Sequence, residues 1–407
     1  MFDSKPPLLV GLDLGTSKVC VAVGELHADR GLGIIGIGQS RSRGVRKGEI
    51  IDPAATADDV RAAIAEAEQM ANVEIRSVYL GVTGSHIRGF NHRGHHNIPS
   101  VDRDITADDV QDVVKNAKAI TLPAENHTVH VIRQHFIVDG QPGVLNPAGM
   151  VGSQIEVDVH VVHGVTHRLQ NPIRAVKSLQ LEVDDLVFSG IASALATLTP
   201  QDKELGALAI DLGAGVTEYV VCADGIIQHT GALAVGGDHV SNDLAYGLKI
   251  SMSRAEALKI EHGGSLPDPA LKGQTLTLTH DVGLPERSVN LDHLRRIMSL
   301  RLEEILEIIA EEIEGAGLLD SIRAGICLVG GGARIPNITT LAERVFGLPV
   351  RIGRMQSLSG LAASLDQPEF ATAIGLVKFG SFQHANPRDR VSWTSRVKQT
   401  LTSLFPA

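Results

Sequence analysis

The sequence has few aromatic residues, few cysteines and no long apolar run, and each of these absences narrows the class of protein. Only 3% of its residues are aromatic, and its three cysteines, Cys20, Cys222 and Cys327, lie in short apolar segments. This usage is typical of buried, reduced thiols in a cytosolic protein and shows no metal-type spacing. No stretch of about 18 apolar residues occurs, so no membrane-spanning helix is expected. The formal net charge of −10 argues against nucleic-acid binding, since such proteins present a basic face.

The Walker-type phosphate loop and the G-x-G-x-x-G fingerprint are also absent, but another glycine-rich turn occurs twice. The segments "VGLDLGTSKVCVAV" at 10–23 and "LAIDLGAGVTEYVV" at 208–221 share an acid, a leucine, a glycine and flanking strand-like runs. A lone Asp-Leu-Gly segment is typical of an ordinary hairpin. Its recurrence in each half of the chain indicates an internal duplication that brings two equal turns to face each other across a cleft.

The two turns have the composition of a polyphosphate site. The first turn consists of Gly15, Thr16, Ser17 and Lys18. Backbone N–H groups of a glycine-rich turn converge on phosphate oxygens, because no side chain blocks their approach. Asp13 and Asp211 are expected to hold Mg²⁺ through water, so that the ion neutralises the phosphates. A third turn, at 330–333, follows an apolar strand, and its bare backbone is expected to let an adenine or ribose lie close.

The expected secondary structure is that of an α/β protein with an insertion. Strands are expected at 8–14, 18–24, 33–38 and 77–83, with a helix that begins at Pro53 and is capped by Asp52. Residues 84–164 differ, because period-2 alternation there predicts a small antiparallel sheet with one face open to water.

Two further segments are interpreted as surface features. The histidines at 86, 92, 95 and 96 match no common metal site and are expected in surface turns. The basic run "RSRGVRKG" at 41–48 is expected to be a solvated loop, with contact to a partner or a lipid headgroup as the alternative.

The order of the three turns resembles that of the superfamily of actin, sugar kinases and heat-shock chaperone ATPases, and within it the chain resembles the FtsA family of bacterial cell-division proteins. The stretches that carry the resemblance cover nearly the whole chain: "GEIIDPAAT", "VTGSHIRGFNHRG", "VHVIRQHFIVDG", "NPAGMVGS", "IDLGAGVTEYVV", "SRAEALKIEHG" and "LVGGGARIPNI". The resemblance implies an actin-like two-lobed α/β fold of duplicated ribonuclease-H-like lobes, with an inserted 1C subdomain in place of the usual 1B.

By the same resemblance, the chain divides into two lobes with one subdomain each. The expected divisions are 1–83 for the first lobe core (1A), completed by about 165–198 and 356–383; 84–164 for 1C; 199–236 for the second lobe core (2A), completed by about 315–355; 237–314 for subdomain 2B; a linker at 381–390; and an amphipathic helix at 391–407.

The resemblance further implies that ATP and Mg²⁺ bind between the lobes. The implied nucleotide contacts are Gly11, Asp13, Gly15, Thr16, Ser17, Lys18, Asp211, Gly213, Ala214, Gly215, Thr217, Gly236, Gly237, Glu256, Lys259, Gly330, Gly331, Gly332 and Ala333. Ala214 is a departure, since the family more often has glycine there. No general base is identified, so ATP hydrolysis is expected to be slow or absent.

The implied partners are those of a division protein on the cytoplasmic face of the plasma membrane. They are other copies of the chain in a filament through 1C and 2B, the C-terminal peptide of the tubulin-like FtsZ, and later division proteins. By position, Arg287, Arg301 and Glu304 match the polar contacts of the FtsZ peptide. An ordinary solvated helix face is the alternative for each of the three residues.

The C-terminal segment is expected to attach the chain to a membrane surface. On a helix, an apolar stripe flanked by basic residues would form from Trp393, Arg396, Val397, Lys398, Leu401, Leu404 and Phe405. Such a helix lies in the headgroup region of an anionic leaflet. The alternative is a terminal helix that packs on its own domain.

Two other functions are compatible with the same superfamily. A PilM-like pilus-assembly scaffold shares the 1C insertion but generally lacks the terminal amphipathic helix, so the segment around Trp393 argues against it. A small-molecule kinase would need an acceptor pocket with a catalytic acid, and the sequence offers no candidate for one.

Overall fold

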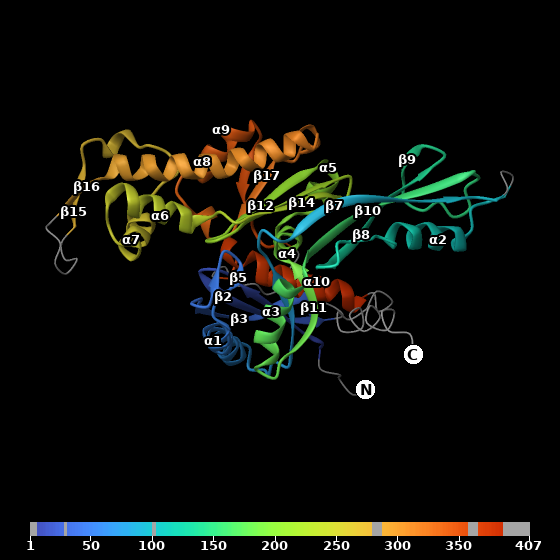
Figure 1. Cartoon of the computed structure of the whole chain (residues 1–407), viewed down its shortest axis with the longest axis horizontal. Helices are drawn as coiled ribbons and strands as arrows, with labels where there is room; N and C mark the ends of the chain where they lie inside the picture. The colour runs from blue at the N-terminus through green and yellow to red at the C-terminus, as the bar shows by residue number, and fades with distance from the viewer. Residues whose placement is uncertain (1–5, 28–30, 100–102, 279–286, 357–364, 386–407) are drawn as a thin grey trace.

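Two five-stranded sheets form the centre of the molecule (Figure 1). The structure is a computed structural model and describes residues 6–27, 31–99, 103–278, 287–356 and 365–385. In spatial order the first sheet consists of β11 (Glu182–Phe188), β6 (Ser77–Val82), β1 (Leu8–Leu14), β2 (Lys18–His27) and β3 (Gly31–Arg41). The second consists of β14 (Ile226–Leu233), β13 (Thr217–Ala223), β12 (Ala207–Leu212), β17 (Ile326–Val329) and β18 (Val350–Ile352).

The two sheets repeat one plan. In each, the first three strands along the chain form an antiparallel meander, β1-β2-β3 or β12-β13-β14. Two parallel strands then extend the sheet on the other side of the first strand, β6 and β11 or β17 and β18. The internal duplication and the two-lobed α/β fold that the sequence predicts are therefore confirmed. We call the first sheet with its helices the first lobe and the second sheet with its helices the second lobe.

Helices pack on both faces of the sheets. They are α1 (Pro53–Ala71), α3 (Thr166–Lys177), α4 (Ser189–Thr197), α5 (Pro200–Leu205), α6 (Gly237–Leu248), α7 (Met252–His262), α8 (Leu291–Gly315), α9 (Ile338–Phe346) and α10 (Ala371–Ala385), with short 3-10 turns η1 (Pro269–Leu271), η2 (Leu319–Ser321), η3 (Gly331–Arg334) and η4 (Pro368–Phe370). As expected, Asp52 caps α1 by accepting a hydrogen bond from the Ala55 N–H, and Pro53 is its first residue. Within the described ranges, no helix is both long and apolar enough to cross a bilayer.

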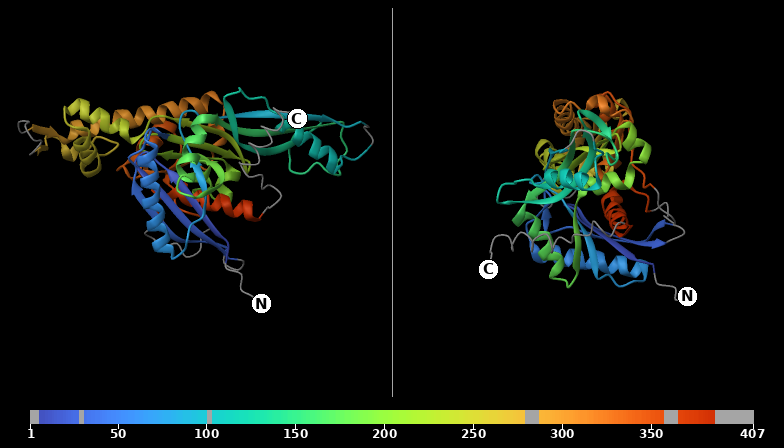
Figure 2. Two further views of the ribbon diagram at one scale, coloured as in Figure 1. Left: turned by 60° about the horizontal axis from the view of Figure 1, so that its bottom comes forward. Right: turned by 90° about the vertical axis from the view of Figure 1, so that its right-hand side faces the viewer.

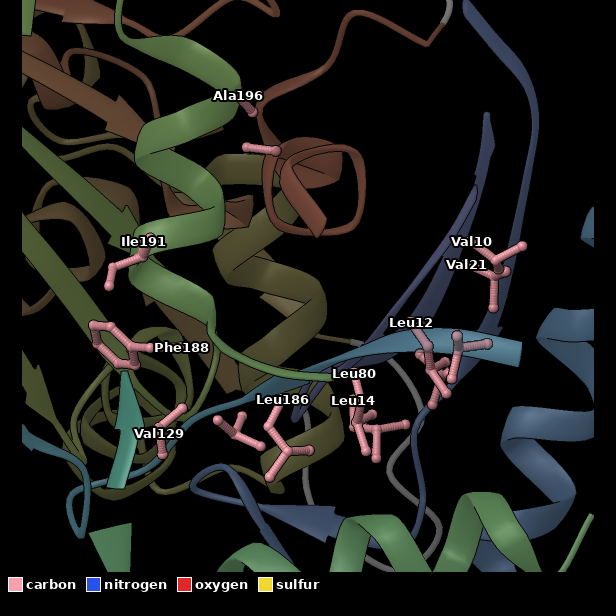
Figure 3. Packing of buried hydrophobic residues seen from close by; sticks show 14 of the residues in the cluster. Val10, Leu12, Leu14, Val21, Leu80, Val129, Leu186, Phe188, Ile191 and Ala196 are labelled. Carbon is pink, nitrogen blue, oxygen red and sulfur yellow. The ribbon is translucent and has the colours of Figure 1, made fainter. Parts of the chain in front are cut away.

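Side chains along the two central strands, β1 and β12, point alternately to the outer helices and to the space between the sheets. Leu12 and Leu14 of β1 pack with residues of α1 and α3 in one apolar cluster, where Leu80 and Leu186 lie beside them (Figure 3). In the second lobe, Ile210 of β12 packs in the same way on α6, α8 and α9. The alternate residues of both strands therefore face the opposite side, where α4 and α10 pack together between the sheets.

An insert leaves the first lobe after β6 and returns to it at α3. Its four strands, in the order β7 (Arg88–Asn97), β10 (Gln154–Val165), β8 (Asn126–Val138) and β9 (Gln141–Val144), form an antiparallel sheet under α2 (Ala107–Lys118). His92, His95 and His96 lie on β7, so the prediction that they occupy surface turns was wrong. Gly94, which lies between them, is also a strand residue and lets the α2 backbone approach closely.

The insert and the α6–α8 region lie at opposite ends of the long axis of the molecule (Figures 1 and 2). The α6–α8 end also carries a hairpin of β15 (Thr275–Leu278) and β16 (Arg287–Asn290). A second small hairpin, of β4 (Val45–Arg46) and β5 (Glu49–Ile50), belongs to the first lobe.

The insert is also hydrogen-bonded to the second lobe, through the edge strand β14. The ring of His160 lies 2.9 Å from the Thr230 hydroxyl through Nε2 and 2.7 Å from the Asn91 amide oxygen through Nδ1. The Gln134 side chain donates to the Ile227 carbonyl oxygen over 2.7 Å. His160, Gln134 and Thr230 are all buried. The insert therefore bridges the two lobes, although the chain connects it to the first lobe only.

The bridge gives stability a predictable dependence on pH. Burial, and to a smaller extent the nearby His229, lowers the pKa of His160 to about 4. An unfolded histidine has a pKa of about 6.5, so the unfolded chain binds this proton first and stability falls as the pH drops from about 6.5 towards 4. We expect His160 to contribute a loss of roughly 2 kcal/mol between pH 7 and pH 5.

His160→Leu is expected to remove this loss while lowering stability at pH 7 by about 1–3 kcal/mol, because Thr230 loses its partner. Urea unfolding at both pH values measures the two effects. His95→Leu, which replaces an exposed histidine of β7, is the matched control. A wild-type pH dependence in His160→Leu would contradict the assignment.

Candidate functional site

The two Asp-Leu-Gly turns have the same shape. In each turn, four residues lie between the last pair of facing strand residues, which are Leu14 and Val19 in the first lobe and Leu212 and Thr217 in the second. A Cβ atom added to Gly15 would lie 2.7 Å from the Lys18 carbonyl oxygen, and one added to Gly213 would lie 2.7 Å from the Val216 carbonyl oxygen. Glycine is therefore needed at the same place in both turns, because the backbone folds back on itself there.

The acids of the two turns face each other between the lobes. Asp13 and Asp211 occupy the inward alternate positions of β1 and β12, and burial together with the charge of Asp211 raises the pKa of Asp13 to about 7, against the opposing charge of Lys18. Burial also raises the pKa of Asp211, although its Oδ2 accepts hydrogen bonds from Ser193 over 2.5 Å and from Thr372 over 2.9 Å. Two carboxylates and one ammonium group thus share a partly buried site.

This donor set fits a magnesium ion held largely through water. Within the described part of the chain, no three Asp, Glu, His or Cys side chains lie close enough to bind one ion directly. An ion near Asp13 and Asp211 would therefore complete its oxygen shell with water or phosphate, as Mg²⁺ does in nucleotide sites. It would also relieve the repulsion between the two acids.

The start of α6 closes over the second turn. The Gly237 N–H donates to the Gly213 carbonyl oxygen over 3.0 Å, and the Asp238 N–H donates to the Ala214 carbonyl oxygen over 2.8 Å. A Cβ atom on Gly236 would lie 2.4 Å from the Gly213 oxygen. Gly236 is therefore required by the close stacking of the two segments.

Glu256 and Lys259 of α7 reach the same place. The Lys259 ammonium donates to the Gly237 carbonyl oxygen over 3.1 Å and to Glu256 Oε2 over 2.6 Å, and the Ser241 hydroxyl also donates to this carboxylate. The structure thus brings both predicted residues to the glycine pair that begins α6.

In the third turn, one glycine faces open space. A Cβ atom on Gly330 would lie 2.3 Å from Asp211 Oδ1, and one on Gly332 would lie 2.3 Å from Leu212 Cγ. Both residues pack on the end of β12 and set the distance between the third turn and Asp211. Gly331 has no atom within 4 Å of the Cβ position and offers bare backbone to a ligand.

At three of the predicted nucleotide contacts, packing within the protein already explains the type of residue, and no ligand is needed to account for it. A Cβ atom on Gly11 would lie 2.3 Å from the carbonyl oxygen of Ala373 in α10. The Thr217 hydroxyl donates to the Val235 carbonyl oxygen over 2.7 Å. Ala333 is buried in the core of the second lobe.

The β4–β5 hairpin joins the site through its tip, while the basic side chains of residues 41–48 are exposed, as expected. The Gly48 N–H donates to Thr16 Oγ1 over 3.1 Å, and a Cβ atom on Gly215 would lie 2.9 Å from the Lys47 backbone. Lys47 and Gly48 have φ values of 51° and 74°, as a two-residue hairpin turn requires. The tip of the hairpin therefore connects the first turn to the second across the cleft.

Glu218 is a second residue of the site that the sequence analysis missed. It pairs directly with Asp211 on the neighbouring strand and is 6% exposed. Among the described residues, its Oε1 has no hydrogen-bond partner. A comparison of the two repeats position by position would have found it, because Cys20 pairs with Asp13 at the same place in the first lobe.

The residues expected to bind the FtsZ peptide are only partly brought together. On α8, Arg301 Nε lies 2.5 Å from Asp243 Oδ2, and Arg301 Nη1 lies 2.5 Å from Glu304 Oε2. Tyr246, one turn beyond Asp243 on α6, is 87% exposed. Arg287 begins β16, beyond the hairpin residues that the structure leaves undescribed. The predicted membrane helix at 391–407 lies outside the described residues.

The contact between the turns can be tested with two glycines. Gly215→Ala is expected to lower the unfolding free energy by about 1–3 kcal/mol, because the new Cβ atom would lie 2.4 Å from Thr16 Oγ1 and 2.9 Å from the Lys47 backbone. Gly331→Ala, in open space, is the matched control and is expected to change stability by less than about 0.5 kcal/mol. Thermal or urea unfolding measures both. Equal stabilities would show that the turns do not touch.

Comparisons with known proteins agree with this fold. The family model described as "Cell division protein FtsA" matches residues 208–375, and the model described as "SHS2 domain inserted in FTSA" matches residues 84–163. Among the similar solved structures is the PilM-PilN type IV pilus biogenesis complex, with a TM-score of 0.62 and 16% identity, which covers 92% of this chain and 98% of that one. Another is MreB5 of Spiroplasma citri bound to ADP, with a TM-score of 0.57 and 15% identity, which covers 94% of this chain and 98% of that one. At these identities the likeness establishes the fold alone, which is the expected actin-like fold with an insert.

Sequence relatives establish the family. The cell division protein FtsA of Pseudomonas aeruginosa is 36% identical over 374 residues, which cover 92% of this chain and 89% of that protein. The cell division protein FtsA of Escherichia coli K12 is 34% identical over 414 residues, which cover 98% of each. A likeness of this extent excludes chance similarity of a single motif, and the chain belongs to the FtsA family of cell division proteins.

Proposed function

We propose that the protein binds ATP with Mg²⁺ between its two lobes. The observation that carries this proposal is that two equal turns, one from each repeat, bring Asp13 and Asp211 together beside Lys18. Solved structures of MreB5 from Spiroplasma citri, which share the fold, are described as bound to ADP and to AMPPNP. Mg²⁺, when bound, would neutralise the phosphate charge.

In this proposal, each part of the site has its own task. The N–H groups of the two turns bind phosphate oxygens, as successive backbone donors do in anion-binding loops. Lys18, whose ammonium lies 4.2 Å from the centre of the Phe370 ring, adds a fixed positive charge. Glu256 and Lys259 border the sugar, and the bare backbone at Gly331 lies against the base.

Neutralising either acid tests the proposal. Asp13→Asn and Asp211→Asn are each expected to weaken Mg²⁺-dependent ATP binding by about tenfold or more, measured by isothermal titration calorimetry, because an ion would lose one of its two charged partners. Both changes are also expected to raise the thermal stability of the nucleotide-free protein, since two facing acids no longer repel each other.

Asp112→Asn, which neutralises an exposed carboxylate on α2 of the insert, is the matched control and should change neither quantity. A wild-type protein without measurable affinity for ATP in the presence of Mg²⁺ would contradict the proposal.

We further propose that the protein anchors FtsZ polymers to the cytoplasmic face of the membrane at the division site and recruits later division proteins. Membership of the family supports this role, and so does the basic amphipathic pattern of residues 391–407. The insert and the α6–α8 region lie at opposite ends of the molecule (Figure 1). Contact between such unlike ends of successive copies produces an open filament, and a filament multiplies the weak attachment of one short helix.

The surface between α6 and α8 has the chemistry for an acidic, partly apolar peptide. Arg301 is held between Asp243 and Glu304, so a peptide carboxylate can replace one of these two partners without moving the guanidinium group. Tyr246 and Leu300 are exposed on the same two helices, 87% and 61% respectively, and offer apolar contacts.

One sedimentation experiment tests both membrane binding and peptide binding. Wild-type protein, anionic phosphatidylglycerol vesicles and a fluorescent peptide with the FtsZ C-terminal sequence are expected to pellet together. Arg301→Ala should pellet with the vesicles but carry roughly tenfold less peptide, because a hydrogen-bonded charge pair is lost. A chain that ends at residue 385 should leave both itself and the peptide in solution.

Arg296→Ala, an exposed arginine of the same helix, is the control and should retain the peptide. Vesicle binding by the shortened chain at the wild-type level would contradict the role of the tail, and peptide binding by Arg301→Ala at the wild-type level would contradict the peptide surface.

A further inference from the structure

The two repeats differ in charge at one buried position beside the acids. In the first lobe Asp13 pairs with Cys20, and in the second lobe Asp211 pairs with Glu218. Side chains directly opposite each other on antiparallel strands lie on the same face of the sheet, about 5 Å apart at Cβ. Only the second lobe therefore places another carboxylate beside the acid of its turn.

The surroundings of Glu218 make a buried carboxylate costly, which argues against a purely structural role for it. Burial raises its pKa well above the usual range, the charges of Asp211 and Asp13 raise it further, and a hydrogen bond from the Thr83 side chain only partly opposes this. Its Oε1 is buried and, within the described residues, accepts no hydrogen bond. Burying an acid without full pairing costs stability, and a neutral side chain such as the cysteine of the first repeat avoids this cost.

The carboxylate lies where the two lobes meet. Thr83 follows β6 of the first lobe, and a Cβ atom on Gly190 at the start of α4 would lie 3.2 Å from Glu218 Cβ. Glu218 therefore extends from β13 of the second lobe to the first lobe, within electrostatic range of both turn acids. If the two turns hold a triphosphate, its terminal phosphate lies between them and the free Oε1 lies at the base of the same site.

The acids of the two turns have other interactions. Asp211 Oδ2 accepts hydrogen bonds from Ser193 and Thr372. Asp13 interacts with Lys18 and, in the proposed function, faces the metal ion. Glu218 differs from both acids, because its Oε1 is buried and, within the described residues, has no hydrogen-bond partner, so this oxygen is able to accept from a water molecule.

We propose that Glu218 is the catalytic base of ATP hydrolysis in this protein, an inference that rests on the proposed binding of ATP. Its Oε1 accepts a hydrogen bond from a water molecule and takes its proton. The water oxygen forms a bond to the terminal phosphorus as the bond from phosphorus to the bridging oxygen breaks. The bridging oxygen leaves on ADP with the bonding electron pair, and the proton passes from Glu218 to the released phosphate.

Glu218→Gln separates this role from a structural one, because catalysis and stability should move in opposite directions. Single-turnover hydrolysis of ATP with Mg²⁺ is expected to fall by about a hundredfold or more. The unfolding temperature of the nucleotide-free protein is expected to rise, since a buried acid is removed and the amide can still bond to Thr83. ATP affinity should change by less than about threefold, because Glu218 binds the water rather than the nucleotide.

Glu182→Gln, an exposed glutamate at the start of β11, is the matched control and should leave hydrolysis and stability unchanged. Glu218→Cys, which copies the residue of the first repeat, serves if the glutamine variant does not fold, with the same expected results. A loss of stability together with activity would show that Glu218 is structural and overturn the proposal.

Two further results would overturn it as well: hydrolysis by either variant at the wild-type rate, or a wild-type protein that binds ATP with Mg²⁺ and hydrolyses it no faster than buffer does. The binding measurement keeps this separate from the proposed function. A protein that binds ATP but does not depend on Glu218 retains the function and loses only the base, whereas a protein that binds no ATP loses both.

Discussion

The repulsion between two partly buried carboxylates, one from each lobe, is the constraint around which the site is built. Apolar side chains at alternate positions of β1 and β12 pack on the outer helices, and this packing turns Asp13 and Asp211 inward. The two acids cannot both be charged cheaply in such a place, as the raised pKa values show. In the proposed function, a cation bound between the lobes would remove this cost.

Close backbone contacts fix the positions of the two acids. Gly15 and Gly213 allow the two turns to fold tightly, and Gly330 brings the third turn against Asp211. The β4–β5 hairpin contacts Thr16 on one side and Gly215 on the other. These contacts connect the lobes at the site itself, while His160 and Thr230 connect them through the insert, so the lobes are joined at two separate places.

The parts of the fold that could be predicted are those encoded locally. The two Asp-Leu-Gly segments identified the duplication, and the Asp52–Pro53 pair marked the start of α1, because turn and cap chemistry depends on a few neighbouring residues. The hairpin tip at Lys47 and the bridge from His160 to Thr230 could not be predicted, since both depend on how distant strands are placed. Glu218 could have been predicted from the sequence, because a comparison of paired positions in the two repeats identifies it.

The most direct test of the central claim is a crystal structure with a non-hydrolysable ATP analogue and Mn²⁺ in place of Mg²⁺, in which anomalous scattering locates the ion. The account predicts one manganese peak beside Asp13 and Asp211, with phosphate oxygens in contact with both turns. An analogue bound elsewhere, or held by one turn while the other faces solvent, would contradict it.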